Sequence, residues 1–361
     1  MLSLSVAFGA AACTADDSAT QRSGPSPSAE TTAEEAEAEA PDLDVAEAAA
    51  RGLVETYSEV VTGMIVLVRV GDETRVLTAG RADVGGDRTM KADERFPIAS
   101  ITKSMVATAV LRLVERGRLA LDDTIDEWLP GLLPQGSRIT IEQLLAHRGG
   151  LHEPEGLRSL AGLDDASYLA LVARERLDFP PGTSGAYSNA GYTVLGLLLE
   201  RVTGRGLGEV LQQEVFGPAR MEDTSLQGRP SVVGYLDGRR VVHNHLQAAR
   251  GAGSVVSTVR DIDRFYQALW NGDLLPSRVV DDMARSRGVV APHVDYGLGL
   301  WRTAVTCGTG IGHSGAMEGF SIRARRLDGT ESSVVVMVND GDGQDIANFL
   351  ADGVLCPEAA D

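Results

Sequence analysis

The chain has 361 residues, of which 43% are hydrophobic, 33 are Lys or Arg and 51 are Asp or Glu, which gives a formal net charge of −18. The length suits one large domain or two small ones, and the apolar fraction is enough for a sizeable core. A charge of this sign repels phosphate, which argues against a nucleic acid or an anionic membrane surface as a partner held by charge. The sequence has no run of about 18 apolar residues that would predict a membrane-spanning helix.

The N-terminus has the features of an export signal. Residues 2–12 are apolar and end in three alanines before Cys13, which is the length of a signal segment and not of a membrane span. The segment resembles a bacterial lipoprotein signal, in which the cysteine is lipidated and becomes the mature N-terminus. Residues 1–13 therefore predict export, either to the outer face of the membrane through a lipid on Cys13 or as a secreted protein; the alternative is a frayed apolar tail.

Residues 14–45 are predicted to be a disordered acidic linker. The first fifty residues contain ten acidic side chains and one basic one, Arg22. With few large apolar residues, this segment cannot bury enough surface to offset chain entropy. The folded domain is predicted to span residues 46–361.

The first predicted elements of that domain are a helix and a hairpin. Residues 45–60 have an amphipathic helical pattern, and the β-rich runs 64–70 and 74–79 are separated by Gly71-Asp72. Residues 102–118 are mostly apolar and free of glycine until Gly117, which predicts a largely buried helix.

The middle of the chain is helical in pattern and the last third returns to strands. Helices are predicted at 141–147, 192–202, 206–215 and 261–271, strands at 296–301, 320–326 and 332–338, and a closing helix at 346–355. This order predicts an α/β (α+β) fold, in which both chain ends form one antiparallel sheet flanked by helices. A mostly helical subdomain, at about residues 106–250, is inserted between them.

Three cysteines leave at least one unpaired. In an exported protein Cys307 and Cys356 can form a disulfide, which leaves Cys13 for lipid or for removal. The alternative is two buried free thiols.

Ser100 and Lys103 stand at the start of the predicted buried helix. Positions i and i+3 share a helix face, and the helix start offers free N–H groups and positive potential. A desolvated lysine loses pKa and can take a hydroxyl proton. The chain has only two lysines, Lys91 and Lys103, and arginine cannot act as such a base. The alternative is a serine N-cap beside a lysine whose charge reaches solvent.

Two further motifs supply partners for this pair. In Tyr187-Ser188-Asn189, a phenol beside an ammonium can have a lowered pKa and relay protons, while the amide can hold a substrate carbonyl; alone, this motif equally fits an ordinary aromatic turn. The second motif, residues 312–316, has small residues that let a substrate backbone lie along a strand edge. Its Ala316 N–H can join that of Ser100 as an oxyanion hole.

Ser-x-x-Lys, Tyr-x-Asn and His-x-Gly, in this order and at these spacings, resemble the serine β-lactamase and penicillin-binding family. The most similar branch holds the exported D-alanyl-D-alanine carboxypeptidases and class C β-lactamases. The similarity runs from about residue 46 to the end, so residues 46–361 are predicted to be a β-lactamase-like serine hydrolase domain. His313, where β-lactamases usually carry Lys, favours the carboxypeptidase side, and those carboxypeptidases carry a late disulfide that matches Cys307 and Cys356.

The resemblance implies acyl transfer through a covalent ester on a serine. The implied catalytic residues are Ser100, Lys103 and Tyr187, and the implied substrate-binding residues are Asn189, His313, Ser314, Gly315 and Ala316. Lys103 and Tyr187 would share base and acid duty, and either of them fits the base because strongly coupled groups titrate as a unit. Asn189 would orient the substrate amide, and His313 would assist protonation or bind a carboxylate.

One position departs from the resemblance. Some carboxypeptidases of this branch carry an Arg directly after the Gly-Leu-Gly-Leu strand, where it holds the terminal carboxylate of the substrate. Here that position is Trp301, with Arg302 next, and neighbouring strand residues point to opposite faces. Strict carboxypeptidase activity is therefore in doubt.

The remaining polar residues are interpreted as structural. His147 stands at the end of a predicted helix, where a histidine interacts favourably with the helix dipole. Arg323, Arg325 and Arg326 are predicted to form a solvated face. The pairs His152-Glu153 and His243/His245 have no convincing ligand spacing, so no metal or other cofactor is expected.

The function expected from the sequence is an exported carboxypeptidase-like penicillin-binding enzyme, acting as a monomer on cell-wall peptides. The first alternative is a β-lactamase or esterase with the same residues, which differs in how fast the acyl-enzyme is hydrolysed. The second is a catalytically silent receptor with the same fold.

Overall fold

The computed structural model describes residues 40–154, 163–241, 249–341 and 343–357. The predicted signal with Cys13, the linker up to residue 39 and the pair His243/His245 lie outside the described residues. Within these ranges, no helix combines the length and apolarity needed to cross a bilayer.

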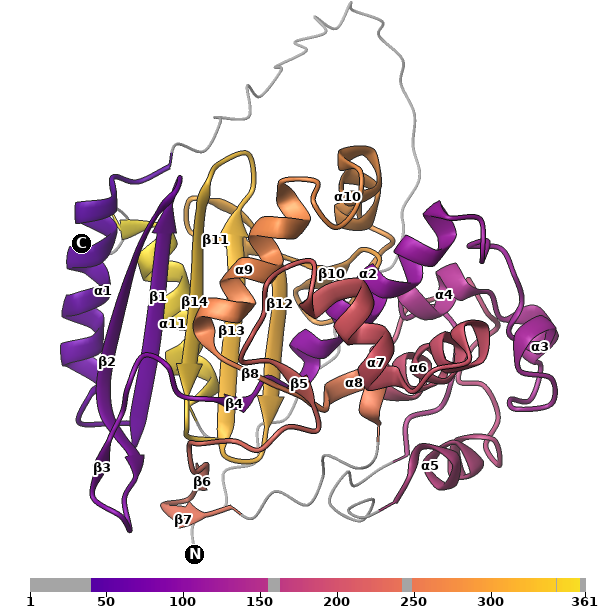
Figure 1. Cartoon of the computed structure of the whole chain (residues 1–361), viewed down its shortest axis with the longest axis horizontal. Helices are drawn as coiled ribbons and strands as arrows, with labels where there is room; N and C mark the ends of the chain where they lie inside the picture. Colours follow the sequence, from indigo (N-terminus) through magenta and orange to yellow (C-terminus); the bar gives the residue numbers. More distant parts are fainter. Residues whose placement is uncertain (1–39, 155–162, 242–248, 342, 358–361) are drawn as a thin grey trace, which may run out of the picture. The chain divides into compact units, whose positions relative to one another are not determined.

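A large antiparallel sheet forms one side of the molecule (Figure 1). Among the described residues it has nine strands in the order β3-β2-β1-β14-β13-β12-β11-β10-β9. Their bounds are β1 Gly63–Val70, β2 Glu73–Asp83, β3 Arg88–Thr89, β9 Val289–Ala291, β10 Val294–Tyr296, β11 Trp301–Val305, β12 Gly308–Met317, β13 Phe320–Leu327 and β14 Ser332–Val338.

Two neighbouring strands of the sheet, β1 and β14, come from opposite ends of the folded chain. β1 pairs with β14 from Met64 opposite Val338 to Val70 opposite Ser332. Successive side chains of a strand point to opposite faces, and both faces of β1 are buried, which explains its continuous apolar sequence. The prediction of one antiparallel sheet built from both chain ends is confirmed.

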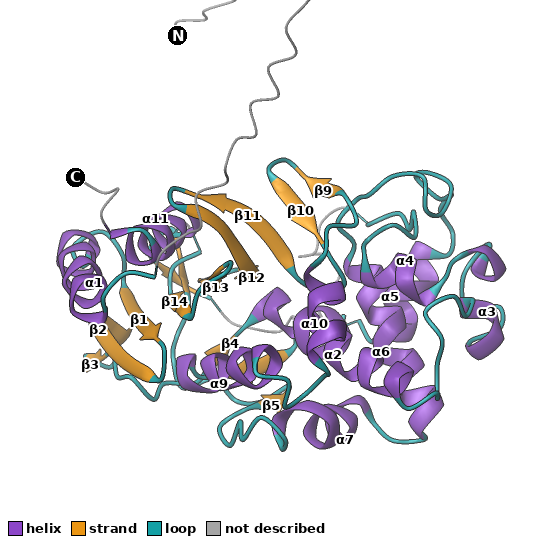
Figure 2. Ribbon diagram, turned by 90° about the horizontal axis from the view of Figure 1, so that it is seen from above, coloured by secondary structure: helices purple, strands orange, loops and turns teal. Residues whose placement is uncertain are grey.

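Helices cover both faces of the sheet (Figure 2). α1 (Leu43–Tyr57) and α11 (Gln344–Leu355) pack together on one face. The other face carries α2 (Thr102–Glu115), α9 (Val259–Trp270) and α10 (Ser277–Ala284).

The first two helices end before their predicted limits. α1 stops at Tyr57 and not at residue 60, and α2 stops at Glu115 and not at residue 118. In the second case Gly117 adopts φ +65°, the left-handed conformation that commonly terminates helices.

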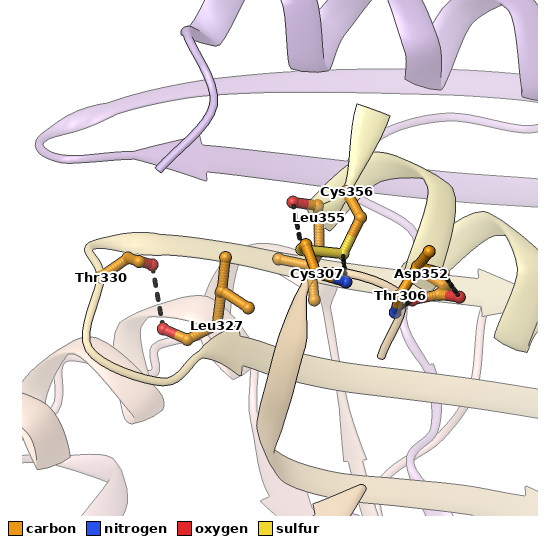
Figure 3. Close-up of a disulfide and its surroundings, with 7 residues drawn as sticks. All are labelled: Thr306, Cys307, Leu327, Thr330, Asp352, Leu355 and Cys356. Atoms are coloured by element: carbon orange, nitrogen blue, oxygen red, sulfur yellow. Dashed lines mark hydrogen bonds between the residues drawn. A yellow bond between two sulfur atoms is a disulfide. The ribbon is translucent and has the colours of Figure 1, made fainter. Parts of the chain in front are cut away.

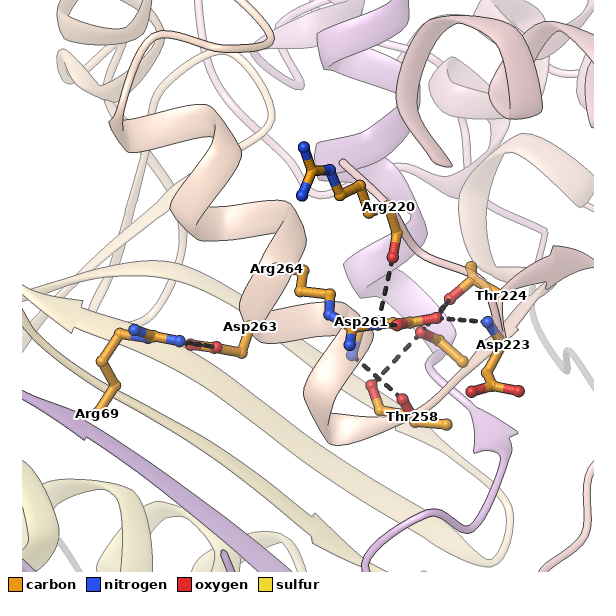
Figure 4. Close-up of polar contacts among 9 residues, drawn as sticks. Arg69, Arg220, Asp223, Thr224, Thr258, Asp261, Asp263 and Arg264 are labelled. Atoms are coloured by element: carbon orange, nitrogen blue, oxygen red, sulfur yellow. Dashed lines mark hydrogen bonds and ion pairs between the residues drawn. The ribbon is translucent and has the colours of Figure 1, made fainter. Parts of the chain in front are cut away.

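Polar contacts anchor the start of α9 (Figure 4). Thr258 caps the helix by accepting the Asp261 N–H at 3.1 Å. Asp263, one turn on, binds the Arg69 guanidinium of β1 with N···O distances of 2.9 and 2.6 Å. The helix is thus fixed to β1, and its Tyr266 contacts Ser104 of α2 on the same side of the sheet.

The helical elements between the two parts of the sheet lie beside it and at right in Figure 1. They are α3 Ile125–Trp128, α4 Ile141–Leu145, α5 Asp165–Val172, α6 Asn189–Thr203, α7 Leu207–Leu211, which continues into a π-helical turn at Gln212–Phe216, and α8 Arg250–Gly253. Short strands accompany them: β4 Phe96–Pro97, β5 Ser225–Leu226, β6 Tyr235–Leu236, β7 Arg239–Arg240 and β8 Val255–Ser257.

The strand predicted at 296–301 is wrong. β10 ends at Tyr296 and β11 begins at Trp301, so the residues between them form the turn that joins two strands. Gly299 has φ +85°, and a Cβ there would lie 2.3 Å from the Cβ of Ala107 on α2. The glycines therefore allow the turn and its close approach to α2, whereas the sequence pattern suggested a continuous strand.

The solvated face predicted for the late arginines is also wrong. Arg323 is 4% exposed, and Arg325 and Arg326 are half-buried. α11 covers this part of β13, and its Asn348 Oδ1 accepts hydrogen bonds from Arg323 at 2.6 Å and Arg325 at 2.7 Å. Burial lowers the pKa of Arg323 to about 10.

A disulfide joins the sheet to the last helix (Figure 3). Cys307, in the turn between β11 and β12, is bonded to Cys356, which ends α11, with Cα atoms 5.5 Å apart. Beside it, Thr306 Oγ1 donates to Asp352 of α11 at 2.7 Å. The predicted pairing is confirmed.

Replacing both cysteines by serine is expected to lower the free energy of unfolding by about 4 kcal/mol, because the bond closes a loop of 49 residues in the unfolded chain. Urea denaturation of the variant and of the oxidised protein measures the loss, and reduced wild-type protein is the control. Equal midpoints for all three samples would show that the bond adds no stability.

Candidate active site

Ser100 lies in a tight turn between a short strand and the buried helix. After β4, the 3-10 turn Ala99–Ile101 leads directly into α2. Ala99 has φ +48°, a left-handed conformation that costs a non-glycine residue about 1–2 kcal/mol. The surrounding structure holds this strain: Ala99 and Ile101 are buried, while Ser100 between them is partly exposed.

Lys103 is fully buried in the first turn of α2. Its Nζ lies 3.0 Å from Ser100 Oγ, 2.8 Å from Asn189 Oδ1 and 2.9 Å from the Ala252 carbonyl oxygen. Burial lowers the pKa of Lys103 from 10.5 to about 7, opposed in part by the negative charge of Glu153. Near neutral pH, much of Lys103 is therefore uncharged.

These three neighbours can satisfy Lys103 in either protonation state. The ammonium can donate to all three oxygens, whereas the neutral amine donates to Asn189 Oδ1 and the Ala252 carbonyl oxygen, and its lone pair can then face the Ser100 hydroxyl. In its neutral form Lys103 is therefore in position to act as the base for Ser100, a choice that the sequence left open between Lys103 and Tyr187.

Tyr187 lies on another side of the lysine. Lys103 Nζ is 4.8 Å from the centroid of the Tyr187 ring, and the hydroxyl of Tyr187 is buried beside the Ser100 side chain. Burial raises the pKa of Tyr187, and the Ser100 side chain opposes this rise only in part. The lowered pKa expected from the sequence is therefore wrong, because a largely uncharged lysine does not offset the cost of a buried phenolate. Tyr187 stays protonated and can donate.

His147 supports Tyr187 from behind. Its ring centroid lies 4.3 Å from that of Tyr187 and 4.4 Å from that of Tyr296. Its Nδ1 accepts the Ser188 N–H at 3.1 Å, which places the ring proton on Nε2. Burial lowers the pKa of His147 well below its usual value, so the ring is neutral and its role fits the structural interpretation.

Asn189 is the first residue of α6, and the carboxylate of Glu153 covers this helix start. Glu153 Oε2 accepts the backbone N–H groups of Asn189 at 2.8 Å and Ala190 at 3.2 Å. Glu153 Oε1 accepts from Asn189 Nδ2 at 3.3 Å, while Asn189 Oδ1 faces Lys103. The Asn189 side chain thus connects the carboxylate to the lysine.

The sequence analysis missed this role of Glu153. It considered Glu153 only beside His152 as a weak metal pair, and the 36 positions between Glu153 and Asn189 leave no local signal. In the part of the chain that the structure describes, no cluster of three His, Cys, Asp or Glu side chains could hold a metal ion.

His313 is a buried residue of β12. Its Nδ1 lies 2.6 Å from the Ser314 carbonyl and its Nε2 lies 3.0 Å from the Tyr296 hydroxyl. A carbonyl only accepts, so Nδ1 carries the proton and Nε2 accepts from Tyr296. Burial lowers the pKa of His313 to about 3. His313 was expected either to assist protonation or to bind a substrate carboxylate. With both nitrogens engaged, this geometry does not support a direct contact with a carboxylate, and a part in protonation stays a prediction.

The strand that carries His313 has a free backbone edge beside Ser100. β12 pairs with β13 up to Met317, but its pairing with β11 stops at Gly312. Residues 313–317 therefore have an unpaired edge in the described sheet. At Gly315 a Cβ would lie 2.3 Å from the Ile98 carbonyl oxygen, so only glycine allows this edge to approach the turn before Ser100.

This approach brings two backbone amides into one region. Ala316 follows Gly315, and Ser100 follows Ala99, whose Cβ lies within 3.4 Å of the position of a Gly315 Cβ. Ala316 is exposed. The pair expected to form an oxyanion hole, Ser100 and Ala316, thus lies on facing segments, and a substrate strand can extend along 313–317.

Trp301 is also part of the wall of the site, whereas Arg302 is not. The Trp301 ring centroid lies 6.1 Å from that of Tyr187 and 5.1 Å from that of His313. Its buried Nε1 has no hydrogen-bond partner in the described ranges. Arg302 lies in another direction and contacts Asp328 at 3.4 Å. The alternation expected along this strand therefore holds, and Arg302 does not replace the missing arginine.

A family model described as Beta-lactamase matches residues 46–355 of this chain. The chain belongs to the beta-lactamase family. The family predicted from the three motifs is thereby confirmed, and the chain is a serine hydrolase of that family.

Named beta-lactamase family relatives differ in what they act on. Penicillin-binding protein 4* of Bacillus subtilis is 27% identical over 309 residues, which cover 77% of this chain and 68% of the relative. Esterase EstB of Burkholderia gladioli is 36% identical over 201 residues, or 50% of this chain and 51% of the esterase. A D-aminopeptidase of Cereibacter sphaeroides is 30% identical over 299 residues, or 77% and 56%. The chain thus spans little more than half the length of the latter two.

Solved structures of the beta-lactamase family fold match more completely. A D-stereospecific amidohydrolase from Streptomyces sp. has a TM-score of 0.72 at 28% identity and covers 87% of this chain and 99% of its own. The D-amino acid amidase from Ochrobactrum anthropi SV3 complexed with L-phenylalanine has a TM-score of 0.75 at 26% identity, covering 87% and 96%. These matches confirm the predicted fold class.

Proposed function

We propose that this chain hydrolyses amide bonds next to D-amino acids through an acyl-enzyme on Ser100. The observation that carries the proposal is the position of Lys103 Nζ, 3.0 Å from Ser100 Oγ and with its other two contacts taken by acceptors. A buried lysine with a pKa of about 7 is matched to proton transfer near neutral pH. The D-aminopeptidase and D-amino acid amidase relatives support the substrate class.

Each chemical step has a group in place. Lys103 takes the hydroxyl proton while Ser100 Oγ bonds to the substrate carbonyl carbon, and the amides of Ser100 and Ala316 stabilise the resulting oxyanion. As the C–N bond breaks, Tyr187 gives its proton to the leaving amine and recovers one from Lys103. Water then adds to the ester carbon while Lys103 takes its proton. As the C–O bond to Ser100 breaks, Lys103 returns the proton to Ser100 Oγ and the acid is released.

The wall of the site favours particular substrates. A D-alanyl-D-alanine carboxypeptidase of cell-wall peptides is the finer function expected from the sequence, and Penicillin-binding protein 4* supports it. However, Arg302 contacts Asp328, so it offers no guanidinium to a terminal carboxylate. We therefore place an uncharged amide or aminoacyl group of the substrate beside the partly exposed Trp301 ring.

The location of the protein is part of the proposal. Export rests on residues 1–13, with Cys13 as a lipid anchor or as part of a cleaved signal. The disulfide between Cys307 and Cys356 supports it, since such bonds persist in oxidising compartments.

Intact-protein mass after a brief exposure to a penicillin tests the mechanism. Wild-type protein is expected to gain one drug mass, and Ser100→Ala to gain none, because the ester has lost its oxygen. Ser104→Ala is the matched control: this serine lies on the same helix, but its hydroxyl contacts Gly299 and Tyr266, not Lys103. Labelling that persists in Ser100→Ala would overturn the assignment of the nucleophile.

The same samples separate the alternatives. A stable adduct shows an acyl-enzyme with slow deacylation, which fits both the proposed amide hydrolase and a penicillin-binding peptidase, whereas free enzyme with consumed drug supports a β-lactamase. A parallel assay compares a D-amino acid amide, a D-alanyl-D-alanine peptide and a p-nitrophenyl ester. Faster turnover of the amide supports the substrate proposed here, and turnover of the peptide alone would overturn it in favour of the carboxypeptidase. Absence of both adduct and turnover would favour the silent receptor.

A further inference from the structure

We propose that Glu153 is a positioning residue of this active site: its carboxylate fixes the Asn189 amide with Oδ1 toward Lys103 and places a negative charge behind that amide. The inference rests on the proposed function, because positioning matters only if Lys103 acts on Ser100. Glu153 itself contacts neither Ser100 nor Lys103 by hydrogen bond; it acts through Asn189.

The carboxylate of Glu153 is held by donors from two helices. Tyr168 of α5 donates its hydroxyl to Oε1 at 2.5 Å, and Ser188, the N-cap of α6, donates to Oε2 at 3.3 Å. The remaining donors are the backbone N–H groups of Asn189 and Ala190 and the Asn189 Nδ2 group. Five donors converge on one carboxylate at a helix N-terminus, so the negative charge is stabilised and its position is fixed.

This acceptor determines which way the Asn189 amide is turned. A carboxylate only accepts, so the NH₂ group of Asn189 must face Glu153. The amide oxygen is then directed to the opposite side, where it meets Lys103 Nζ at 2.8 Å. With the amide reversed, an N–H group would face the lysine and Lys103 would lose an acceptor.

The charge of Glu153 also acts on Lys103. The other titratable groups facing this lysine are Tyr187 and Tyr192, whose ring centroids lie 4.8 and 5.7 Å from Nζ, and the buried residues His147 and His313. Burial keeps both tyrosines protonated and both histidines neutral.

Around Glu153 itself, burial and the carboxylate raise the pKa of Tyr168, so this neighbour stays uncharged. His152 precedes it and is bonded to Asp178 at the surface. The negative charge that raises the pKa of Lys103 is therefore that of Glu153.

Glu153→Gln is expected to disturb both effects. In wild type, one carboxylate oxygen accepts from the backbone N–H groups of α6 and the other accepts from the side chains of Tyr168 and Asn189. A glutamine has only one acceptor oxygen, so it can serve one of these two sets of donors but not both. Its NH₂ group then faces another donor and favours reversal of the Asn189 amide. Removal of the charge is expected to lower the pKa of Lys103 below its wild-type value of about 7. Acylation of Ser100 is expected to slow by about 10²-fold, the effect of a misplaced reacting group.

The lysine content of the chain allows a direct measurement. Only Lys91 and Lys103 are present, so protein labelled with carbon-13 at lysine Cε gives two signals, and Lys91→Arg assigns them. Lys91 is exposed and serves as an internal reference. Titration of the Lys103 signal in wild type and in Glu153→Gln reports its pKa without any substrate, and a penicillin acylation rate measured across pH reports the function.

A charge-preserving variant and a distant control complete the design. Glu153→Asp keeps the charge but shortens the side chain, so the Lys103 titration is expected to stay close to wild type while acylation falls. Glu214→Gln removes another buried carboxylate, bonded to Arg112 and Arg116 near the far end of α2; it is expected to lower stability and to leave the Lys103 titration unchanged.

The outcomes separate this inference from the proposed function. An unchanged Lys103 titration and an unchanged acylation rate in Glu153→Gln would overturn the positioning role. Equal shifts in Glu153→Gln and Glu214→Gln would also overturn it, since they would show general loosening of the fold. Wild-type protein that reacts with no acylating probe would overturn the proposed function. If the Lys103 titration still responded to Glu153→Gln in that case, it would support only the effect of the Glu153 charge on Lys103.

Discussion

Lys103→Arg is expected to slow acylation of Ser100 by about 10²- to 10⁴-fold, the range attributed to a general base. Arginine has a similar length, but it does not deprotonate at any working pH, so it cannot take the proton of Ser100. Below pH 7, where Lys103 is itself largely protonated, the variant carries the same charge as wild type, whereas above pH 7 it has lost the neutral base. The rate of covalent labelling by a penicillin, followed by intact mass, provides the measurement.

The pH dependence of the same rate adds a signed prediction. Because neutral Lys103 is the base, the wild-type rate should rise as the pH passes about 7 and then level off. Tyr187 does not interrupt the plateau in this range, since burial raises its pKa. Lys91→Arg, a change at the exposed lysine, should match wild type. A Lys103→Arg rate close to that of wild type would exclude Lys103 as the base.

Lys103→Met is expected to remove a large pH dependence of stability. The unfolded chain keeps its lysine proton up to about pH 10.5, whereas the folded protein releases it at about pH 7. Between these values the unfolded state binds the extra proton, so the free energy of unfolding of wild type rises with pH; below pH 7 the full cost of burying the charge is present. Between pH 6 and pH 9 the rise amounts to about 3 kcal/mol, at 1.36 kcal/mol per pKa unit.

Denaturant unfolding of both proteins at pH 6 and pH 9 measures this difference. The variant leaves the Asn189 and Ala252 oxygens without their donor, which costs stability equally at both pH values. The comparison across pH therefore isolates the lysine. Parallel curves for the two proteins would show that Lys103 titrates alike in the folded and unfolded states.

Most residues of the candidate active site could be named from the sequence because their signals are local. Ser100 and Lys103 are three positions apart on one helix, and this spacing alone makes their contact at 3.0 Å plausible. Tyr187 and Asn189 are two positions apart, in the turn and first residue of α6. Only the resemblance to a known family predicted that these two motifs and the His-x-Gly motif, which lie far apart in the sequence, form one site.

The features that sequence analysis missed depend on contacts between distant segments. Glu153 meets Asn189 only after the chain between α4 and α6 has folded back. Arg323 belongs to a strand with a polar pattern, and only the packing of α11 on β13 shows that its guanidinium is buried. The pKa of Tyr187 likewise depends on how completely the hydroxyl is enclosed, which charge pairing alone does not predict.

The pairing of β1 with β14 has a consequence for how the protein is made. Met64 lies opposite Val338, so these two strands can pair only when almost the whole chain is available. Pairings between such distant segments form slowly. Until β14 has been synthesised, β1 lacks this partner, and its apolar side chains on both faces stay exposed and prone to aggregation. The growing chain should therefore need a holding chaperone until its last strands appear, and truncations before residue 332 should be insoluble.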